Sequence, residues 1–366
     1  MDYYNKYGLK RVINASGKMT ILGVSKYVEE AIKAQTFGGQ NFFEISELEN
    51  KIGQYIAELI NVEASHVVSS ASAGIALSIA GIIGQGSSYH LHHPYSKKIT
   101  QREIIIPKGH NVDYGAPIEM MIEVGGGNVI EAGYANMCYP NHIEELITDQ
   151  TAAILYIKSH HTVQKSMLTV KEAAEVAHKH KLPLIVDAAA EQDLYQYIKD
   201  GADLVIYSGA KAFEGPSSGL VIGKEEYIEW IRLQSQGIGR AMKIGKENIL
   251  GLAAAIETYL EVGPESGDKM KERLNPLIRQ LNSIEGISSA IIQDSAGRDI
   301  YRAEVKIEEN SDLTAEEVVE KLKLGQPAIY TREYQVNNGI IEFDVRAVNE
   351  KEIQLIYERM KEILRK

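Results

Sequence analysis

The sequence predicts an α/β protein with a large domain built on a mostly parallel sheet and a small α+β domain at its carboxyl end. Three observations support this prediction. The chain has 366 residues, which at roughly 150 residues per domain is more than one ordinary domain. Short apolar runs alternate with helical segments in the middle of the chain, an order typical of a parallel, helix-covered sheet. The composition then becomes strongly charged at residues 263–265.

The expected strands of the large domain are short runs of apolar, often β-branched residues. They lie at 66–70, 103–107, 120–124, 152–157, 184–187 and 204–208, with a returning strand at 219–222. Two helices between them are indicated by composition and pattern. Residues 73–83 are rich in Ala, Ile and Leu, and residues 169–180 are amphipathic, open with a Thr cap and end before Lys-Leu-Pro.

The small domain is expected to follow a long connecting helix over residues 248–260. Its expected elements are a helix at 268–281, a strand at 301–307, a helix from Thr314, two strands flanking the turn at 337–339, and a final helix. We therefore expect an amino-terminal arm over residues 1–20, a large domain over 21–262 and a small domain over 263–366.

Charge and apolar run lengths disfavour several classes of partner. The 39 Lys and Arg against 50 Asp and Glu give a formal net charge of −11, which disfavours binding to nucleic acid. The apolar runs are shorter than the ~20 residues that span a bilayer, and the acidic start lacks a signal-peptide core. We therefore expect a cytoplasmic protein without a membrane partner. The single cysteine, Cys138, is expected to be a small buried hydrophobe.

Asp187 and Lys211 are the leading candidates for catalysis. Asp187 ends an expected buried strand, and Lys211 follows the next strand in a loop of small residues. Both would lie at the carboxyl edge of the sheet, where ligands bind in doubly wound folds. A lysine that forms an imine and a carboxylate beside a ring nitrogen are what pyridoxal phosphate requires of a protein. Ser208 could then bond the cofactor phosphate, whereas a surface lysine and a turn-capping aspartate would explain the same spacing.

Residues 69–74, Ser-Ser-Ala-Ser-Ala-Gly, join an expected strand to the start of a helix. Backbone N–H groups, hydroxyls and the helix dipole converge there, and small residues let the backbone approach a phosphate closely. The segment therefore indicates an anion site, with an ordinary Ser N-cap as the alternative. No GxxxxGK[ST] motif occurs, and the glycines at 125–127 lack the GxGxxG spacing.

Several histidines could lie near the same edge of the sheet. His110 follows one expected strand and could stack on a flat cofactor ring, or be a simple loop histidine. His160 and His161 follow another strand, so that one of them could also face the site. The histidines at 90–93 have neither an HExxH nor a paired CxxC pattern, and no metal site is expected.

Candidate cations for an anionic substrate occur in two places. Arg240, Lys243 and Lys246 have the spacing i, i+3 and i+6, which on a helix places them along one side. They could clamp a phosphate or form a solvated basic face. Arg332 and Arg346 lie in expected strands flanking the small-domain hairpin, where either could bind a carboxylate bidentately, although surface arginines are common in strands.

Taken together, these segments resemble the fold type I pyridoxal-phosphate enzymes, in particular the group of bacterial selenocysteine synthase and its shorter relatives. The matching segments extend over nearly the whole chain, and the most specific is YSGAKAFEGPSSGLVIGK. The others are VINASGKMTILG, QNFFEISELENKIGQYIAELI, SSASAGIAL, IVDAAAE, GIGRAMKIGKE, PAIYTREY and FDVRAV. The resemblance implies an aspartate aminotransferase-like fold with a seven-stranded type of sheet, and a homodimer or larger symmetric assembly.

The resemblance also implies roles for individual residues. Lys211 would form the internal aldimine with pyridoxal 5'-phosphate, and Asp187 would pair with the pyridine nitrogen. The cofactor phosphate would be surrounded by Ser72, Ala73, Gly74 and Ser208.

Two departures distinguish this chain from selenocysteine synthase itself. Met1 runs almost directly into VINASG, so the tRNA-binding extension is expected to be missing. Lys243 stands where the second arginine of a paired motif would follow Arg240. The run GRAMKIGKE instead resembles the short relatives described as D-glucosaminate-6-phosphate ammonia-lyases.

That likeness implies loss of water and then ammonia from D-glucosaminate 6-phosphate, giving 2-keto-3-deoxy-6-phosphogluconate. Lys211 would take the C2 proton, and His160 and His161 are candidate acids for the leaving hydroxyl. Arg346 or Arg332 would hold the carboxylate, and Arg240 with Lys243 the phosphate.

Two alternatives stay open at this point. One is a related pyridoxal-phosphate enzyme acting on another β-hydroxy amino acid, including a selenocysteine-synthase-like reaction. The other is a cofactor-free binding protein on the same fold. The basic cluster favours a phosphorylated substrate and therefore argues against an enzyme for another β-hydroxy amino acid. The presence of Lys211 and Asp187 argues against a cofactor-free binding protein.

Overall fold

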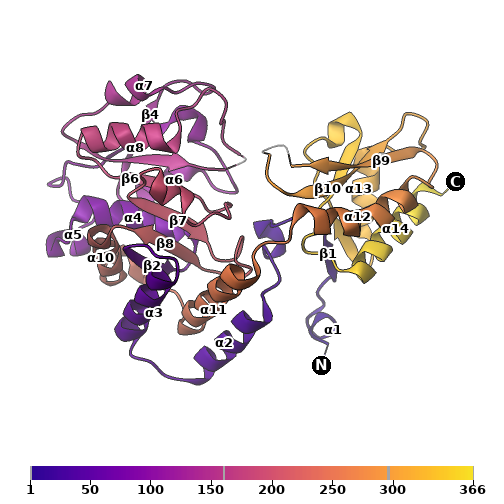
Figure 1. Cartoon of the computed structure of the whole chain (residues 1–366), viewed down its shortest axis with the longest axis horizontal. Helices are drawn as coiled ribbons and strands as arrows, with labels where there is room; N and C mark the ends of the chain where they lie inside the picture. The colour runs from indigo at the N-terminus through magenta and orange to yellow at the C-terminus, as the bar shows by residue number, and fades with distance from the viewer. Residues whose placement is uncertain (1, 160, 295–296, 366) are drawn as a thin grey trace. The chain divides into compact units, whose positions relative to one another are not determined.

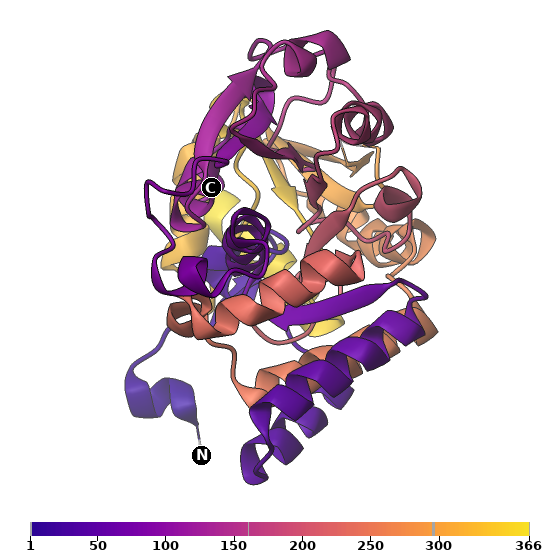
Figure 2. The same cartoon turned by 90° about the vertical axis from the view of Figure 1, so that its left-hand side faces the viewer.

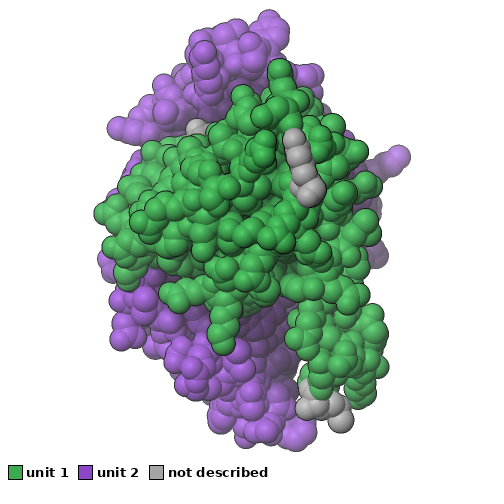
Figure 3. Space-filling view, turned by 90° about the vertical axis from the view of Figure 1, so that its right-hand side faces the viewer, with its two compact units in different colours: residues 1–26, 264–366 green, residues 27–263 purple. Residues whose placement is uncertain are grey.

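The computed structural model describes residues 2–159, 161–294 and 297–365. The chain forms two compact units, residues 27–263 and residues 1–26 together with 264–366 (Figure 3). The amino-terminal residues, expected as a separate arm, group with the carboxyl-terminal unit. The reason is that β1 (Val12–Asn14) pairs in parallel with β11 (Ala328–Tyr330), far along the chain.

The larger unit is built on a seven-stranded sheet of order β2-β8-β7-β6-β5-β3-β4 (Figure 1). Its strands are β2 (Ala64–Val68), β3 (Glu103–Pro107), β4 (Asn128–Ala132), β5 (Thr151–Ile157), β6 (Leu184–Asp187), β7 (Leu204–Ser208) and β8 (Gly219–Gly223). Among the described strands of this sheet, β8 alone runs in the direction opposite to the others. The prediction of a mostly parallel sheet is therefore confirmed, and the carboxyl ends of the other six strands lie at one edge.

Helices of the larger unit connect the strands and bury both faces of the sheet in apolar clusters. They are α2 (Glu29–Gln40), α3 (Ile45–Leu59), α4 (Ala71–Gly84), α5 (Ser88–His92), α6 (Ile118–Val124), α7 (Pro140–Glu144), α8 (Val170–Lys179), α9 (Gln196–Lys199), α10 (Glu225–Leu233) and α11 (Lys246–Val262). The Thr169 cap of α8 is confirmed, since its hydroxyl accepts from Glu172 N–H in a capping box.

Helices α2 and α11 lie side by side (Figure 1), as a second view also shows (Figure 2). Gly38 makes this approach possible, because a Cβ at that position would lie 2.8 Å from Glu247 Cα. The long helix expected over residues 248–260 is thus confirmed as α11 and packs against the start of the unit.

The smaller unit has a three-stranded antiparallel sheet of order β12-β10-β9 beside the β1–β11 pair. Its further elements are α1 (Tyr3–Tyr7), the 3-10 turns η1 (Thr20–Leu22) and η5 (Val336–Asn338), α12 (Gly267–Leu281), β9 (Ile287–Gln293), β10 (Tyr301–Ile307), α13 (Ala315–Leu324), β12 (Ile340–Phe343) and α14 (Glu350–Leu364). An apolar core of its own fills the space between them. The expected small α+β architecture is confirmed.

Two expectations about individual elements were wrong. Residues 120–124 end helix α6 and do not form a strand, because the helical spacing of Ile118 and Ile122 buries one face of this turn. The strand of this region is β4. The strands flanking residues 337–339 do not pair with each other as a hairpin, since β11 pairs with β1 and β12 with β10.

Two further features bear on the sequence expectations. None of the helices in the described parts of the chain combines the length and apolar character needed to cross a membrane. Cys138 is buried, and burial raises the pKa of its thiol to about 11, which keeps it protonated and unreactive at neutral pH.

Candidate functional site

The predicted cofactor residues follow strands whose carboxyl ends meet at one edge of the larger unit's sheet. Val68 at the end of β2 and Ser208 at the end of β7 both pair with Gly219 of β8. The loops that follow β2 and β7 are thus held close to the same strand. Gly219 is required there, because a Cβ would lie 2.6 Å from the backbone of Ser70.

Asp187, the last residue of β6, is buried beneath this edge and accepts a 3.0 Å hydrogen bond from the N–H of Ala189. Burial raises the pKa of its carboxyl to about 6, although the Ala189 bond and the positive charge of Lys211 both lower it. Asp187 pairs with Ile206 of β7, the strand that Lys211 follows, so both residues belong to neighbouring strand ends at one edge of the sheet.

The loop that positions Lys211 is closed by short backbone bonds. Lys211 N–H donates to the Ser208 carbonyl at 3.3 Å, and Gly209 N–H donates to the Ser218 carbonyl at 2.9 Å. A Cβ on Gly209 would lie 2.1 Å from the Ser218 hydroxyl, so glycine is needed for this closure. The lysine is fixed at its Cα while its side chain stays partly exposed.

The expected anion loop forms the start of α4. Ser70 is its N-cap, and the Ser70 hydroxyl accepts a 3.0 Å bond from Ala73 N–H. The Ser70 carbonyl accepts from Gly74 N–H at 2.9 Å. Since Ala73 and Gly74 already donate within the loop, Ser72 is the strongest phosphate-binding candidate of the three predicted residues.

Tyr114 belongs to this site but was not predicted from the sequence. It lies in the loop between β3 and α6, and its buried Oη has no well-formed hydrogen-bond partner in the described parts of the chain. Burial and the negative charge of Asp187 raise the pKa of the phenol, while the nearby Ser72 hydroxyl lowers it. Tyr114 therefore lies close to two of the predicted cofactor residues.

His110 was expected either to stack on the cofactor or to be a simple loop histidine, and its burial favours the second interpretation. The ring is fully buried, its Nδ1 accepts from Ile157 N–H at 3.4 Å, and its Nε2 lies 3.2 Å from the Val163 carbonyl. Burial is the main reason why its pKa falls to about 4. It packs edge-on against Tyr156 and presents no face to a ligand.

His161 and His160 were the two candidate acids for the leaving hydroxyl. His161 is an exposed turn residue whose backbone N–H donates to the Ser159 hydroxyl at 3.2 Å. His160 lies outside the described residues.

The basic cluster does not lie along one helix as expected. Arg240 is in the 3-10 turn η4 (Ile238–Met242), Lys243 ends that turn in an extended conformation, and Lys246 begins α11. The glycines at 237, 239 and 245 explain the break in helical structure. The Lys246 ammonium donates to the carbonyls of Gly38 and Gly39, so it fastens α11 to the end of α2.

Arg240 and Lys243 instead line a cavity of about 300 Å³ in the larger unit. His66 and Glu49 are among its other walls. Burial lowers the pKa of His66 to about 4 and raises that of Glu49, so His66 is neutral at physiological pH and Glu49 is less readily ionised than usual. Arg240 and Lys243 are exposed basic residues of this cavity.

The two predicted carboxylate-binding arginines belong to the smaller unit, but neither lies within a strand. Arg332 makes an isolated bridge to Glu342, and Arg346 lies in the turn after β12. Arg332 Nε donates to Glu342 at 3.2 Å, and its guanidinium lies 4.9 Å from the Tyr334 ring centre. Arg346 is held by Asp344 through two nitrogens.

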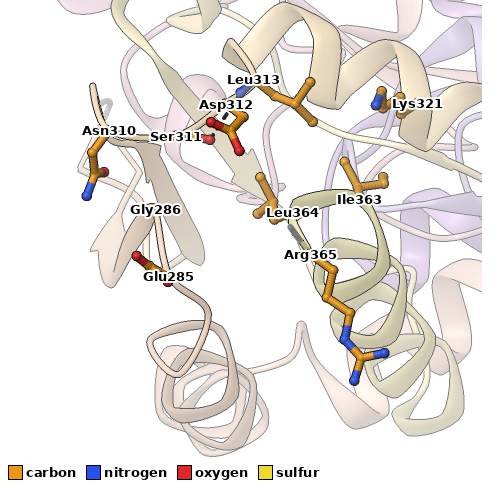
Figure 4. Close-up of a pocket in the computed structure, with 10 residues that line it drawn as sticks. All are labelled: Glu285, Gly286, Asn310, Ser311, Asp312, Leu313, Lys321, Ile363, Leu364 and Arg365. Atoms are coloured by element: carbon orange, nitrogen blue, oxygen red, sulfur yellow. Dashed lines mark hydrogen bonds between the residues drawn. The ribbon is translucent and has the colours of Figure 1, made fainter.

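A second cavity, of about 170 Å³, lies in the smaller unit between the turn at Gly286, the loop at 310–313 and the end of α14 (Figure 4). Glu285 and Asp312 contribute acidic groups, and Lys321 and Arg365 basic ones. Among the described residues that line it are none of the predicted site residues. It therefore adds nothing to the candidate site.

Comparison with known proteins gives a family match and similarities that extend over nearly the whole chain. A family model described as L-seryl-tRNA selenium transferase matches residues 44–311. The chain is 43% identical to a D-glucosaminate-6-phosphate ammonia lyase of Salmonella typhimurium (strain 14028s / SGSC 2262), over 99% of this chain and 98% of the relative. It is 32% identical to a 5'-C-glycyluridine monooxygenase-decarboxylase of a Streptomyces species, over 99% of this chain and 92% of the relative. A solved structure of a D-glucosaminate-6-phosphate ammonia-lyase matches with a TM-score of 0.93 and 42% identity, covering 100% of this chain and 98% of the other.

Proposed function

The chain belongs to the L-seryl-tRNA selenium transferase family, and from this premise we propose that it is a pyridoxal-phosphate-dependent ammonia-lyase acting on D-glucosaminate 6-phosphate. The products would be 2-keto-3-deoxy-6-phosphogluconate and ammonia. The fold is that of the aspartate aminotransferase-like pyridoxal-phosphate enzymes. The observation on which the proposal depends is that buried Asp187 ends β6 and Lys211 follows the neighbouring strand β7, in a chain 43% identical to a D-glucosaminate-6-phosphate ammonia lyase.

The residues at the sheet edge fit pyridoxal phosphate. A buried carboxylate, a lysine that follows the neighbouring strand and the buried Tyr114 hydroxyl together provide groups that would bind a charged, hydrogen-bonding ring. When bound, this cofactor supplies an electron sink that allows a C–H bond beside an amine to be broken. Asp187 would hold its negative charge near the ring nitrogen, while Ser72, Ser208 and Tyr114 would hold the rest of the group.

Lys211 would hold the cofactor and then move protons. Once its amine is released, it would act as the general base that removes the C2 proton of the substrate. The C3 hydroxyl leaves as water and needs a proton donor, for which His161 and His160 stay our candidates.

Arg240 and Lys243 would bind the substrate phosphate, and Arg346 or Arg332 the carboxylate. A guanidinium and an ammonium facing one cavity suit a dianionic phosphate, because charged hydrogen bonds are stronger than neutral ones. We leave Lys246 out of this clamp, because its ammonium donates to backbone carbonyls of α2.

The phosphate clamp gives a specific prediction for the double variant Arg240→Ala/Lys243→Ala. We expect KM for D-glucosaminate 6-phosphate to rise about 10- to 100-fold, as loss of charged hydrogen bonds implies. Activity on unphosphorylated D-glucosaminate should change little, so the preference for the phosphorylated substrate should shrink. Lys246→Ala is the matched comparison: it should lower the unfolding temperature but keep the preference. Equal losses on both substrates in the double variant would contradict the clamp.

A direct test of the proposed function is to follow ammonia and 2-keto acid release from D-glucosaminate 6-phosphate and from D-glucosaminate. We expect stoichiometric release of both products, with a much higher kcat/KM for the phosphorylated substrate than for the unphosphorylated one. Absence of turnover, or equal turnover of both substrates, would overturn the proposal. Release of carbon dioxide in place of ammonia would instead favour a decarboxylase, like the reaction named for the 32% identical relative.

We also propose that the protein is a cytoplasmic homodimer or larger symmetric assembly that takes part in amino sugar acid breakdown. Support for self-association comes from large apolar side chains that this single chain leaves exposed near α2 and α3. Phe42 is 99% exposed, and Ile32, Phe37 and Ile45 are about half exposed. Light scattering of the purified protein would test the assembly, and a monomeric mass would contradict it.

A further inference from the structure

The loop that follows Asp187 is held by tyrosine hydroxyl groups. Tyr207 Oη of β7 donates to the Asp193 carbonyl at 2.8 Å, and Tyr259 Oη of α11 donates to the Gln192 carbonyl at 2.7 Å. The Tyr207 ring is buried, and Tyr259 packs against the same apolar core. Two consecutive carbonyls of the loop are therefore bonded to two different elements of the larger unit.

The same loop is bonded to the Asp187 carboxylate at its start. Ala188 N–H donates to the Ile206 carbonyl of β7 at 2.9 Å, and Ala189 N–H donates to Asp187 Oδ1 at 3.0 Å. Glu191 N–H then donates to the Ala188 carbonyl at 2.9 Å, so the start of the loop is closed by a turn. The Ala189 bond favours the ionised carboxylate and lowers the pKa of Asp187. A shift of residues 191–193 would therefore disturb the bond that Ala189 makes to Asp187.

Helix α11 also packs against the loop that contains Lys211. A Cβ on Gly215, at the end of that loop, would lie 3.0 Å from Ala255 Cβ. The buried ring of Phe213 lies edge-on to the ring of Tyr259, with 5.2 Å between the ring centres. Ala255 and Tyr259 are four residues apart, so they lie on one face of the helix. The helix face that packs against the lysine loop therefore also carries the hydroxyl that holds the loop after β6.

The separation of these two loops matters for a rigid cofactor. The ring nitrogen of pyridoxal phosphate and the carbon that bonds to a lysine lie at opposite ends of one aromatic ring. Their protein partners, Asp187 and Lys211, must therefore keep a fixed separation, and a displacement of about 1 Å costs much of the interaction. Since loops move more than strands, a side chain that contacts both loops would keep this separation.

We propose that Tyr259 is a positioning residue whose hydroxyl group fixes Asp187 relative to Lys211. Tyr259 would act through the loop at 188–193 and through Phe213, not by contact with the cofactor. The inference rests on the proposed function only in taking pyridoxal phosphate as the cofactor. It goes beyond that proposal because it gives a role to a residue of α11, a helix that carries none of the predicted cofactor-binding residues.

The variant Tyr259→Phe tests the inference through two cofactor analogues, without turnover. It removes the hydroxyl group but keeps the ring against Phe213. Pyridoxamine 5'-phosphate has the ring nitrogen, and 1-deazapyridoxamine 5'-phosphate has a C–H group in its place. Isothermal titration calorimetry of the cofactor-free protein measures the binding of each analogue.

The measured quantity is the preference for the analogue with the ring nitrogen, taken as the ratio of the two Kd values. In the wild type we expect a preference of about 10- to 100-fold, because a charged hydrogen bond between Asp187 and the ring forms only with that analogue. In Tyr259→Phe the preference should fall by about 2- to 10-fold, since a neutral hydrogen bond that holds the loop is lost. Equal weakening of both analogues would overturn the inference.

Tyr156→Phe is the matched control. Tyr156 is buried, and its Oη also donates to a backbone carbonyl of the larger unit, that of Leu168 at 3.2 Å. This bond joins β5 to the segment before α8 and involves neither the loop at 188–193 nor the loop at 209–215. Both variants should lower the unfolding temperature, but only Tyr259→Phe should lower the preference. The same loss of preference in Tyr156→Phe would contradict a specific role of Tyr259.

Combining Tyr259→Phe with Asp187→Asn tests whether the tyrosine acts through the aspartate. Asparagine carries no charge to be positioned. In the Asp187→Asn background, Tyr259→Phe should therefore change the ratio of the two Kd values by less than about twofold, below the range expected for loss of one hydrogen bond. An effect as large as in the wild-type background would overturn the inference.

If Tyr259→Phe does not fold, Tyr207→Phe replaces it, because it removes the bond to the adjacent carbonyl of Asp193. The preference should again fall, and a wild-type preference in the folded variant would overturn the inference. Absence of any preference in the wild type would overturn the role of Asp187 and this inference with it. Failure to turn over D-glucosaminate 6-phosphate, in a protein that shows the preference, would overturn the proposed function alone.

Discussion

Replacing Lys211 by alanine is expected to lower kcat for D-glucosaminate 6-phosphate by about 10³- to 10⁴-fold. The expected loss is this large because one side chain both attaches the cofactor and removes the C2 proton, and general acid–base catalysis alone contributes about 10²- to 10⁴-fold. Steady-state kinetics with saturating pyridoxal phosphate would measure the effect. The visible absorption of the bound cofactor should also shift, because its covalent bond to the protein is lost.

Lys199→Ala is the control for this variant. Lys199 is an exposed lysine of the same unit, in α9, and its replacement should leave kcat and the spectrum unchanged. Borohydride treatment of the wild type should leave the cofactor on the peptide that contains Lys211. Labelling of another lysine, or near-normal activity of Lys211→Ala, would contradict the assignment.

Replacing Asp187 by asparagine should lower activity yet stabilise the cofactor-free protein. We expect kcat to fall by about 10²- to 10³-fold, the range seen when one preorganised electrostatic group is removed from a catalytic site. Without the cofactor, however, the buried carboxylate of Asp187 has only partial compensation for its lost hydration. The amide of asparagine avoids the cost of ionising this group.

The pH dependence of this stabilisation follows from the raised pKa. The folded protein keeps the Asp187 proton up to about pH 6, whereas the usual pKa of the group is 3.8. Between these values the folded state binds more protons than the unfolded state, so the free energy of unfolding of the wild type falls as pH rises. Above pH 6 the free energy of unfolding of the wild type is lower by about 3 kcal/mol at most. The free energy of unfolding of Asp187→Asn does not change in this way, because asparagine does not ionise.

Urea unfolding of the cofactor-free proteins at pH 4.5 and pH 7.5 would check this prediction. The stability advantage of Asp187→Asn should be largest at pH 7.5 and should shrink at pH 4.5. Asp149→Asn, a change at an exposed carboxyl of the same unit, should show no such advantage. A variant that is less stable than the wild type at pH 7.5 would contradict the argument.

Much of the larger unit could be predicted from the sequence because its strands are buried on both faces. Such strands appear as continuous apolar runs, as 204–208 does, and the Thr169 capping box gave a further local signal. The same reasoning wrongly predicted a strand at residues 120–124. These residues are helical because Ile118 and Ile122 pack into the core on one face of the helix, and the short apolar run by itself does not indicate this packing.

The candidate site was predictable where strand ends position residues directly and not where irregular loops do so. Asp187 and Lys211 follow neighbouring strands, so topology alone brings them together. His110 and Tyr114 both follow β3, and the sequence analysis selected only His110, which is nearer to the end of the strand. The path of the intervening backbone buries His110 and brings Tyr114 to the site, and that path depends on tertiary contacts such as the one between His110 and Val163.

The pairing of β1 with β11 has a consequence for biosynthesis. More than 300 residues separate the two strands, so β1 leaves the ribosome long before its partner has been translated. At about 5–20 residues per second, the wait is on the order of 15–60 s. During this time residues 27–263 can complete their own core, while the amino-terminal segment has no strand to join. Nascent chains stalled before residue 328 should therefore leave the first 26 residues open to proteases although the larger unit is already resistant.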